Sequence, residues 1–466
     1  MAKSGENELK RVLGPWAAAS IVVGTMIGSG IFLVPRTMIN SVGTAGLVAA
    51  VWIAGGLLSL AGALSYAELA AAIPEAGGEY AYLREAYGPL WGFLYSWTQM
   101  WVAKSGSIAT LATGFFVYLA NFFPALEKTF YALPPPLGPH GGPLEFRYGQ
   151  LFAMALILLL GWLNYHGVKT GGDVQVAVTA LKLALIAFII VAGLAFGQAH
   201  APSTAPVASL SFAGFIAALV AALWAYDGWN NVSMVAGEVR DPQRNLPRAL
   251  IWGTAAVIAI YLLASGAYFH VLSAPEAGAS DRVAAEMMRR IFGGAGASAV
   301  SVAAMISIFA ALNGSILSGS RVPYAAAREG HFFPAIGRVS PKYRTPGVSI
   351  LALCAWAAVL ALSGKYDDLF NLVIFASWIL YGMTAAAVLV LRIKRPDLRR
   401  PYRTPGYPAV PILFVLASLV LVFSTAVQRP RESVIGISLI ALGLPFHFYW
   451  KRRSNGGSSH IRTIGT

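Results

Sequence analysis

Runs of apolar residues about twenty long recur from near Leu13 to Trp450, and they constrain this chain more than any other feature. A helix of about 20 residues crosses the roughly 30 Å of bilayer hydrocarbon, where every backbone polar group needs a partner within the protein. Of the 466 residues, 57% are hydrophobic and 12% are charged, whereas a soluble domain has about 25% charged residues. The sequence therefore predicts an all-α membrane protein without a separate soluble domain.

We predict about twelve transmembrane helices, which places both termini on the same side of the membrane. With these spans, 23 of the 34 Lys and Arg residues lie on the terminal side, 9 lie on the opposite side, and Lys104 and Lys182 lie inside spans. Because Lys and Arg are enriched in cytoplasmic connections, we predict cytoplasmic termini in a cell inner (plasma) membrane. The predicted spans are residues 13–39, 44–72, 89–122, 149–165, 172–197, 211–236, 248–272, 297–325, 347–363, 367–392, 408–427 and 432–450.

The remaining segments are predicted from their composition. Residues 1–12 form a cytoplasmic tail, residues 13–450 form a single transmembrane domain, and residues 451–466 form a basic, Gly- and Ser-rich tail that we expect to be disordered. The stretch Glu79–Ala86 has amphipathic spacing, which predicts a short interfacial helix on the cytoplasmic side. The Pro- and Gly-rich stretch Phe122–Arg147 is predicted to be an external connector.

Two of the predicted spans are interrupted by residues that disfavour a helix. The first span contains Gly28-Ser29-Gly30 near its middle, and the sixth contains Asp227-Gly228 at a similar depth. Breaks at corresponding positions of two five-span halves indicate a transporter binding site, because irregular backbone in a membrane is tolerated only where it lines a cavity or is buried in protein. Glycines also occur where membrane helices pack closely. An intramembrane Asp, however, costs free energy unless it faces polar surroundings, so the pair of breaks favours a site.

The two breaks also predict what kind of molecule is bound. A broken helix exposes N–H groups where one half begins and carbonyl groups where the other half ends. The first kind of end attracts an anion, and the second attracts a cation. A zwitterionic amino acid carries both charges, so we predict an amino acid as the substrate.

Several motifs taken together resemble a known family. The first-span segment Gly24–Phe32 is similar to the signature of transporters in the amino acid, polyamine and organocation superfamily. Further segments resemble the L-type amino acid transporters and their bacterial relatives, so that the resemblance covers about residues 12–450. These segments are Trp224–Asn230, Glu238, Arg244–Pro247, Tyr66–Leu69, Gly77–Tyr82, Asn313–Ser315 and Arg328–His331.

The resemblance implies a LeuT-like fold that works by alternating access. Spans 1 to 5 and 6 to 10, about residues 13–197 and 211–392, would form inverted repeats, and two additional helices would follow at residues 408–450. Trp224 matches an aromatic gate over the substrate, although an ordinary packing role stays open, and Asn230 matches a polar residue that holds the unwound segment. The implied substrate contacts are the N–H groups of Gly28, Ser29 and Gly30 for the carboxylate, and carbonyls near Met26, Ile27, Trp224 and Asp227 for the ammonium.

Lys182 lies in the middle of the fifth span among apolar residues, where a buried ammonium needs hydrogen-bond acceptors. The resemblance places this lysine where sodium-coupled relatives bind sodium, between spans one and eight, with Ser307 as a contact in span eight. It therefore implies sodium-independent transport with Lys182 and Ser307 as coupling residues. A purely structural role for Lys182 stays open, and so does the role of Lys104 in span three.

The resemblance also bears on partners. Animal members of the group join a heavy-chain glycoprotein through a cysteine in the connection after span three, but Phe122–Arg147 contains none. The one cysteine, Cys354, lies inside an apolar run, so we expect no disulfide-linked heavy chain. Asp227 occurs in members that handle cationic or disulfide-bridged amino acids and in bacterial members that handle small neutral ones, so the substrate's charge stays open. We expect an amino acid and membrane lipid as partners, and no cofactor, metal or nucleic acid.

Other classes of protein are disfavoured by what the sequence lacks. An enzyme needs paired carboxylates, a nucleophile with its base or metal ligands, whereas the seven histidines are scattered without such partners. No Gly-rich phosphate loop followed by Lys and Ser or Thr is present, which argues against ATP-driven pumping. The sequence therefore predicts a secondary active amino acid permease or exchanger that is not an enzyme. The alternatives are a proton-coupled symporter of amino acids or polyamines and, from another class, a channel or membrane sensor.

Overall fold

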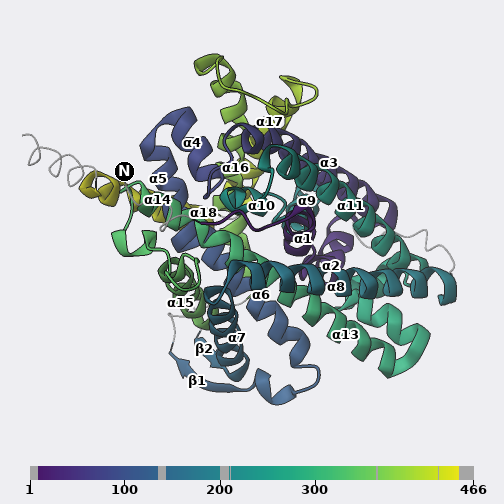
Figure 1. Cartoon of the computed structure of the whole chain (residues 1–466). Helices are drawn as coiled ribbons and strands as arrows, with labels where there is room; N and C mark the ends of the chain where they lie inside the picture. The colour runs from purple at the N-terminus through teal and green to yellow at the C-terminus, as the bar shows by residue number, and fades with distance from the viewer. Residues whose placement is uncertain are drawn as a thin grey trace, which may run out of the picture.

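Helices long and apolar enough to cross a membrane make up most of the computed structural model (Figure 1). The structure describes residues 9–134, 143–199, 209, 211–363, 366–428 and 430–450. Within these residues, 10 helical segments have the length and composition of a membrane span, and two shorter apolar helices, Phe212–Tyr226 and Gly347–Leu362, complete the predicted twelve. The chain is therefore a multi-pass, all-α membrane protein of about twelve helices, as predicted. The tail at 451–466 and residues 1–8 lie outside the described residues.

The elements agree with most predicted spans to within a few residues. Between α10 and α11, and at three other places, short 3-10 or π-helical turns connect or interrupt the α-helices. The α-helices and strands are α1 Pro15–Met26, α2 Gly30–Val42, α3 Ala45–Ala72, α4 Glu79–Tyr87, α5 Pro89–Thr98, α6 Lys104–Leu119, β1 Thr129–Leu133, β2 Leu144–Arg147, α7 Tyr148–Tyr165, α8 Val168–Phe196, α9 Phe212–Tyr226, α10 Asn231–Met234, α11 Pro242–Val271, α12 Ala274–Ala279, α13 Val283–Gly319, α14 Arg321–Arg328, α15 Gly347–Ser363, α16 Tyr366–Lys394, α17 Ala409–Gln428 and α18 Pro430–Ala441.

Two spans begin earlier than predicted, and one changes its helix type. The helix α11 starts at Pro242, a first-turn position that tolerates the missing N–H of proline. The helix α13 starts at Val283 and is kinked at Gly293, whose φ is +66°. In the third span, α5 and α6 are joined by the π-helix Gln99–Ala103. The π-helix lies directly before Lys104, the deep lysine singled out in the sequence.

Spans at corresponding positions of the two predicted halves pack on one another. The helix α3 packs along α11, α6 along α13, and α7 along α15. The two broken spans lie between these pairs, with α2 against α9 and α1 against α10. Figure 1 shows α1, α9 and α10 near the middle of the bundle. This packing brings the two breaks, about two hundred residues apart in the chain, into one place.

Two connections differ from their prediction. The stretch Phe122–Arg147, predicted only as a connector, contains an antiparallel hairpin of β1 and β2. The predicted short helix near Glu79 is present as α4, but it is buried more deeply in protein than its amphipathic spacing indicated, and its interfacial position stays a prediction. Glu79, Tyr80 and Tyr82 are fully buried, and α4 packs against α5 and α16. Its apolar face therefore meets protein rather than lipid.

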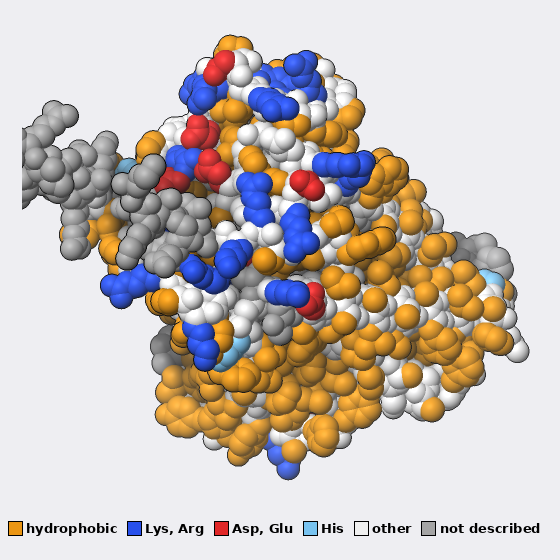
Figure 2. All heavy atoms as spheres, in the orientation of Figure 1, with side chains coloured by type: hydrophobic (Ala, Val, Ile, Leu, Met, Phe, Trp, Pro, Cys, Tyr) orange, Lys and Arg blue, Asp and Glu red, His pale blue; other side chains and the backbone are white. Residues whose placement is uncertain are grey.

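The surface is largely apolar around the spans. Figure 2 shows hydrophobic side chains over most of the lower and right-hand part of the molecule, while Lys and Arg gather in the upper part, near α4, α10 and α16. Large side chains such as Trp16 (80% exposed) and Phe423 (72% exposed) lie on this surface. In water such exposure would be unfavourable, whereas bilayer hydrocarbon accommodates it. The surface thus agrees with the membrane-spanning assignment.

Candidate functional site

The two helix breaks contact each other through hydrogen bonds as well as packing. The hydroxyl of Thr25, at the end of α1, lies 2.8 Å from the carbonyl oxygen of Gly228. The hydroxyl of Tyr261, on α11, lies 2.8 Å from the carbonyl oxygen of Met26 and 2.7 Å from that of Ala225. The Tyr261 side chain therefore provides hydrogen bonds to the carbonyl ends of both α1 and α9. Such partners are what a backbone without helical hydrogen bonds needs inside a membrane.

Glycines permit this close approach at two positions. A Cβ atom on Gly30 would lie 2.6 Å from the Cα of Ala225, so only glycine lets α2 and α9 touch here. Gly228 has a φ of +105°, which side chains rarely adopt. Gly28 has more room, because its Cβ would lie 3.2 Å from the Cδ2 of Leu111. Gly30 thus has the close-packing role that the sequence left open as an alternative, while Gly28 leaves space beside the break.

A small polar pocket lies between the two breaks. Its volume is about 20 Å³, enough for a single water molecule. Of the predicted substrate contacts, Ile27 and Asn230 do not line it. Those that do are Met26, Gly28, Ser29, Gly30, Trp224 and Asp227, and the lining residues that the sequence did not single out as substrate contacts are Thr25, Ser107, Leu111, Gly228, Asn231 and Ser315.

The backbone at the first break is partly engaged within the protein. The N–H of Gly28 donates to the carbonyl of Met26 at 2.9 Å. The helix α2 begins at Gly30, which lines the pocket, and the N–H groups of Phe32 and Leu33 in its first turn donate to the carbonyl of Ser29. A helix start carries a partial positive charge that favours an anion. This end of the pocket is therefore suited to a carboxylate.

Ile27 contacts the two predicted coupling residues instead of the pocket. The ammonium of Lys182, on α8, donates to the carbonyls of Gly24 and Ile27, each at 2.6 Å. The hydroxyl of Ser307, on α13, donates to the carbonyl of Ile27 at 3.0 Å. Lys182 and Ser307 are fully buried. Lys182 and Ser307 thus link the carbonyl end of α1 to spans five and eight.

The second break is held by side chains from three other helices. Lys104, on α6, donates to the Asn231 amide oxygen at 2.6 Å, and the hydroxyl of Tyr381, on α16, donates to the Asp227 carboxylate at 2.8 Å. The amide of Asn230 donates to the carboxylate of Glu79, on α4. Lys104, whose role the sequence left open, is therefore directly bonded to a residue that lines the pocket.

Glu79 reaches Asn230 because of the turn that precedes α4. Gly77 and Gly78 have φ values of +93° and +52°, and the Gly77 N–H donates to the carbonyl of Met234 at 2.8 Å. These contacts bring the start of α4 against α10. Burial raises the pKa of the Glu79 carboxyl to about 7, although hydrogen bonds to the carboxylate and the positive charge of Lys104 act in the lowering direction.

Both ends of the pocket are closed by contacts between distant segments. Near the N-terminal end of α1, the N–H of Leu13 donates to the carbonyl of Glu238 at 2.9 Å. The carboxylate of Glu238 also forms a fully buried ion pair with Arg321 at 2.7 Å. At the far end of α2, the side chains of Arg36 and Asn40 donate to the carbonyl of Gly278 at 3.3 Å and 3.0 Å. These contacts join the first span to distant segments at both of its ends.

Comparison with known proteins identifies the family. A sequence profile described as amino acid permease matches residues 13–446. The chain belongs to the amino acid permease family. This membership agrees with the resemblance inferred from the motifs of the first and sixth spans.

Several amino acid exchangers and transporters are similar to this chain over nearly its whole length. The serine/threonine exchanger SteT of Bacillus subtilis is 35% identical over 451 residues, covering 96% of this chain and 98% of that protein. The human b(0,+)-type amino acid transporter 1 is 33% identical over 461 residues, covering 98% and 91%. The mouse Asc-type amino acid transporter 1 is 32% identical over 456 residues, covering 96% and 82%. The chain is thus an amino acid transporter by family.

The two glycines of the first break are expected to respond differently to substitution. Gly28→Ala should leave the protein folded and weaken amino acid binding at least tenfold, because the new methyl group enters space beside the pocket. Gly30→Ala should lower the thermal unfolding midpoint, because its Cβ meets the backbone of Ala225. Binding affinity and melting temperature in detergent would be measured for both. Equal affinity of Gly28→Ala and the unmodified protein would contradict a role for Gly28 at the site.

Glu79 predicts a specific dependence of stability on pH. Because its pKa is raised from 4.5 to about 7 in the folded protein, the folded state binds more protons than the unfolded state between these values. Stability contributed by the neutral carboxyl is therefore present at low pH and falls as pH rises, by at most about 1.4 kcal/mol per unit. Glu79→Gln should flatten this part of the profile. Glu75→Gln, on a half-exposed side chain, serves as control, and unchanged slopes in Glu79→Gln would refute the prediction.

Proposed function

We propose that this protein is a secondary active transporter that exchanges small neutral amino acids across the cell membrane by alternating access. The observation that carries the proposal is the pocket between the two helix breaks, where a helix start and a helix end face the same small space. A zwitterion matches such a pair of ends. Membership of the amino acid permease family supports the same substrate class.

The charges beside the pocket support a neutral substrate. Asp227 lines the pocket. Lys104 donates a hydrogen bond to Asn231, which also lines the pocket, so side chains of opposite charge lie beside this space. The other polar lining groups, such as Ser107 and Ser315, are hydroxyls. A serine- or threonine-sized side chain suits these walls. The name of the serine/threonine exchanger, with 35% identity, is consistent with this choice.

Exchange rather than channel conduction is supported by the two closed ends. The contacts of Leu13, Glu238 and Arg321 close one end, and those of Arg36 and Asn40 close the other. A continuous pore is not consistent with a 20 Å³ space between them. A proton-coupled symporter remains the second candidate, supported by the titratable Glu79 bonded to Asn230.

Lys182 supports sodium independence. Its ammonium occupies two carbonyl oxygens at the end of α1, with the Ser307 hydroxyl on one of them. A sodium ion would require the same oxygens, and the fixed charge would repel it. We therefore propose that Lys182 and Ser307 couple span one to span eight without a bound cation.

Orientation and partners complete the proposal. The concentration of Lys and Arg near α4, α10 and α16 (Figure 2) supports a cytoplasmic location for that end. Leu13 lies at the same end, because its N–H donates to the carbonyl of Glu238, shortly after α10. Cys354 is the chain's one cysteine and is fully buried in α15. We propose that the transporter works without a disulfide-linked subunit.

Counterflow in liposomes tests the proposed function. Purified protein would be reconstituted in liposomes loaded with unlabelled L-serine, and entry of labelled L-serine would be followed with sodium or choline outside. We expect saturable uptake that is at least tenfold faster than into empty liposomes and is the same in both salts. Uptake into empty liposomes driven by an inward proton gradient would favour the symporter, and non-saturating flux would favour a channel. Dependence on sodium would contradict the role given to Lys182.

Lys182→Ala tests the coupling residue. Two carbonyls at the end of α1 lose their charged donor, so the coupling of α1 to α8 and α13 is weakened. Turnover should fall at least tenfold, while the substrate dissociation constant changes less. Leu181→Ala, on an adjacent side chain that is 49% exposed, is the control. Initial rates and binding constants across a pH series distinguish the roles: equal turnover refutes coupling, and an unchanged pH profile refutes a proton-carrying role.

A further inference from the structure

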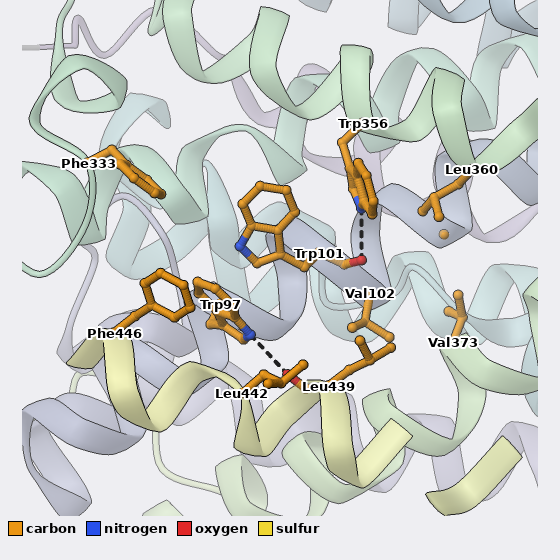
Figure 3. A pocket seen from close by; sticks show the side chains of 11 residues that line it. Trp97, Trp101, Val102, Phe333, Trp356, Leu360, Val373, Leu439, Leu442 and Phe446 are labelled. Carbon is orange, nitrogen blue, oxygen red and sulfur yellow. Dashed lines mark hydrogen bonds between the residues drawn. The ribbon is translucent and has the colours of Figure 1, made fainter. Parts of the chain in front are cut away.

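A second, much larger cavity lies away from the pocket between the helix breaks. It has a volume of about 540 Å³ and lies between the third span, α15, α16 and the end of α18 with the residues that follow it (Figure 3). None of its lining residues belongs to the small polar pocket. They are Trp97, Trp101, Val102, Gly106, Phe333, Trp356, Leu360, Val373, Leu439, Leu442 and Phe446.

The walls of this cavity are apolar, and among the described residues one indole N–H in them has no hydrogen-bond acceptor. No lining side chain is charged. The indole N–H groups of Trp97 and Trp356 donate to the carbonyls of Leu439 and Trp101, each at 2.9 Å. The indole nitrogen of Trp101 is buried and has no partner among the residues that the structure describes. Figure 3 shows this nitrogen on the side of the ring nearer to Phe333 and Trp97.

The cavity is open to the apolar outer surface of the bundle. Three of its lining side chains are exposed: Phe333 (41%), Leu442 (54%) and Phe446 (41%). In a membrane this surface is in contact with lipid. Water gains too few hydrogen bonds from such walls to fill the space, and an empty space of this size loses contacts on every side. The bilayer supplies molecules with a long apolar chain and oxygen acceptors at one end.

We propose that this cavity binds an acyl chain of a membrane phospholipid. The chain fills the space between the third span and the C-terminal helix, and it replaces contacts that the walls otherwise lack. A lipid oxygen entering from the Phe333 end accepts the N–H of Trp101. Ligand pockets of about 300–1,000 Å³ with mostly apolar walls and few polar groups are typical of small-molecule sites, and this cavity is within that range.

The position of the cavity connects a bound lipid to the transport site. Trp101 and Val102 belong to the π-helix Gln99–Ala103, which is one residue before Lys104. Lys104 in turn donates to Asn231 beside the polar pocket. A Cβ on Gly106 would lie 2.6 Å from the Cγ2 of Val373, so this wall is as close to α16 as a glycine permits. A π-helical turn frequently marks a functional position. In this proposal the lipid contacts the π-helix through Trp101 and Val102, on the side that faces the cavity.

Photochemical labelling tests the site directly. The full-length protein would be placed in vesicles of phosphatidylethanolamine and phosphatidylglycerol that contain a small fraction of phosphatidylethanolamine with a diazirine in mid-chain. After illumination, labelled peptides are mapped by mass spectrometry. We expect labelling within residues 97–106, in addition to general labelling of lipid-facing residues such as Phe188. Absence of label from residues 97–106 while Phe188 is labelled would overturn the proposal.

A filled cavity provides the matched comparison. The double variant Leu360→Phe and Leu442→Trp adds volume on two walls of the cavity. The control, Leu351→Phe and Ile437→Trp, introduces the same two aromatic side chains at exposed positions of α15 and α18 outside the cavity lining. We expect the label within residues 97–106 to fall at least fivefold in the filled variant and to stay unchanged in the control. Equal labelling of the two variants would overturn the proposal.

Retention of lipid by the purified protein gives an independent measurement. In native mass spectrometry from detergent, the unmodified and control proteins should retain one phospholipid, and the filled variant should lose it at least tenfold more readily. Slow maleimide labelling of the buried Cys354 would show that each variant is folded. Equal retention by folded filled and control proteins would count against the site. These measurements use lipid alone, so they do not depend on the proposed transport substrate.

Discussion

Backbone polar groups that lack helical partners inside the bundle are the constraint on which the rest of this structure depends. The first and sixth spans both stop being helical in the middle of the bundle, and hydrocarbon offers nothing to replace the lost hydrogen bonds. Tyr261 and Lys182 from neighbouring helices, and Thr25 from the first span itself, supply the replacements. The arrangement of α8, α11 and α13 around the breaks can be understood as the means of holding this backbone.

The same requirement explains why charged side chains are buried here. Lys182 binds the carbonyl end of α1, and Lys104 binds an amide beside the sixth-span break. Each ammonium has an acceptor at 2.6 Å, which offsets part of the cost of removing it from water. Because both lysines come from helices outside the broken spans, a movement of either break has to change a buried charged contact.

Contacts at the two ends of the pocket have different chemistry. At the Leu13 end, a buried ion pair of Glu238 and Arg321 and a backbone pairing close the bundle. At the other end, the closing contacts are hydrogen bonds to the carbonyl of Gly278 and an exposed ion pair of Arg36 and Asp281. Breaking a buried ion pair costs more than breaking an exposed one, because a charge is left without solvent. The free energy needed to break the closing contacts therefore differs between the two ends.

Much of the fold could be predicted because its signals are local. The length and hydropathy of each run predicted about twelve spans, and the glycines and Asp227 indicated where two of them break. The earlier start of α13, the π-helix before Lys104 and the burial of α4 were not predictable in this way. Each of them depends on which segment packs alongside, and hydropathy does not distinguish a protein neighbour from lipid.

For the site, the sequence by itself determined that a polar, irregular backbone lies in the membrane, since Gly28, Gly30 and Asp227 are unfavourable in a lipid-facing helix. The tertiary structure alone decided which groups face the pocket and which hold it. Ile27 and Asn230 point to Lys182 and Glu79, whereas Ser107, Asn231 and Ser315 line the space. The reason is that these residues are brought together by helices whose packing is set by contacts between distant parts of the chain.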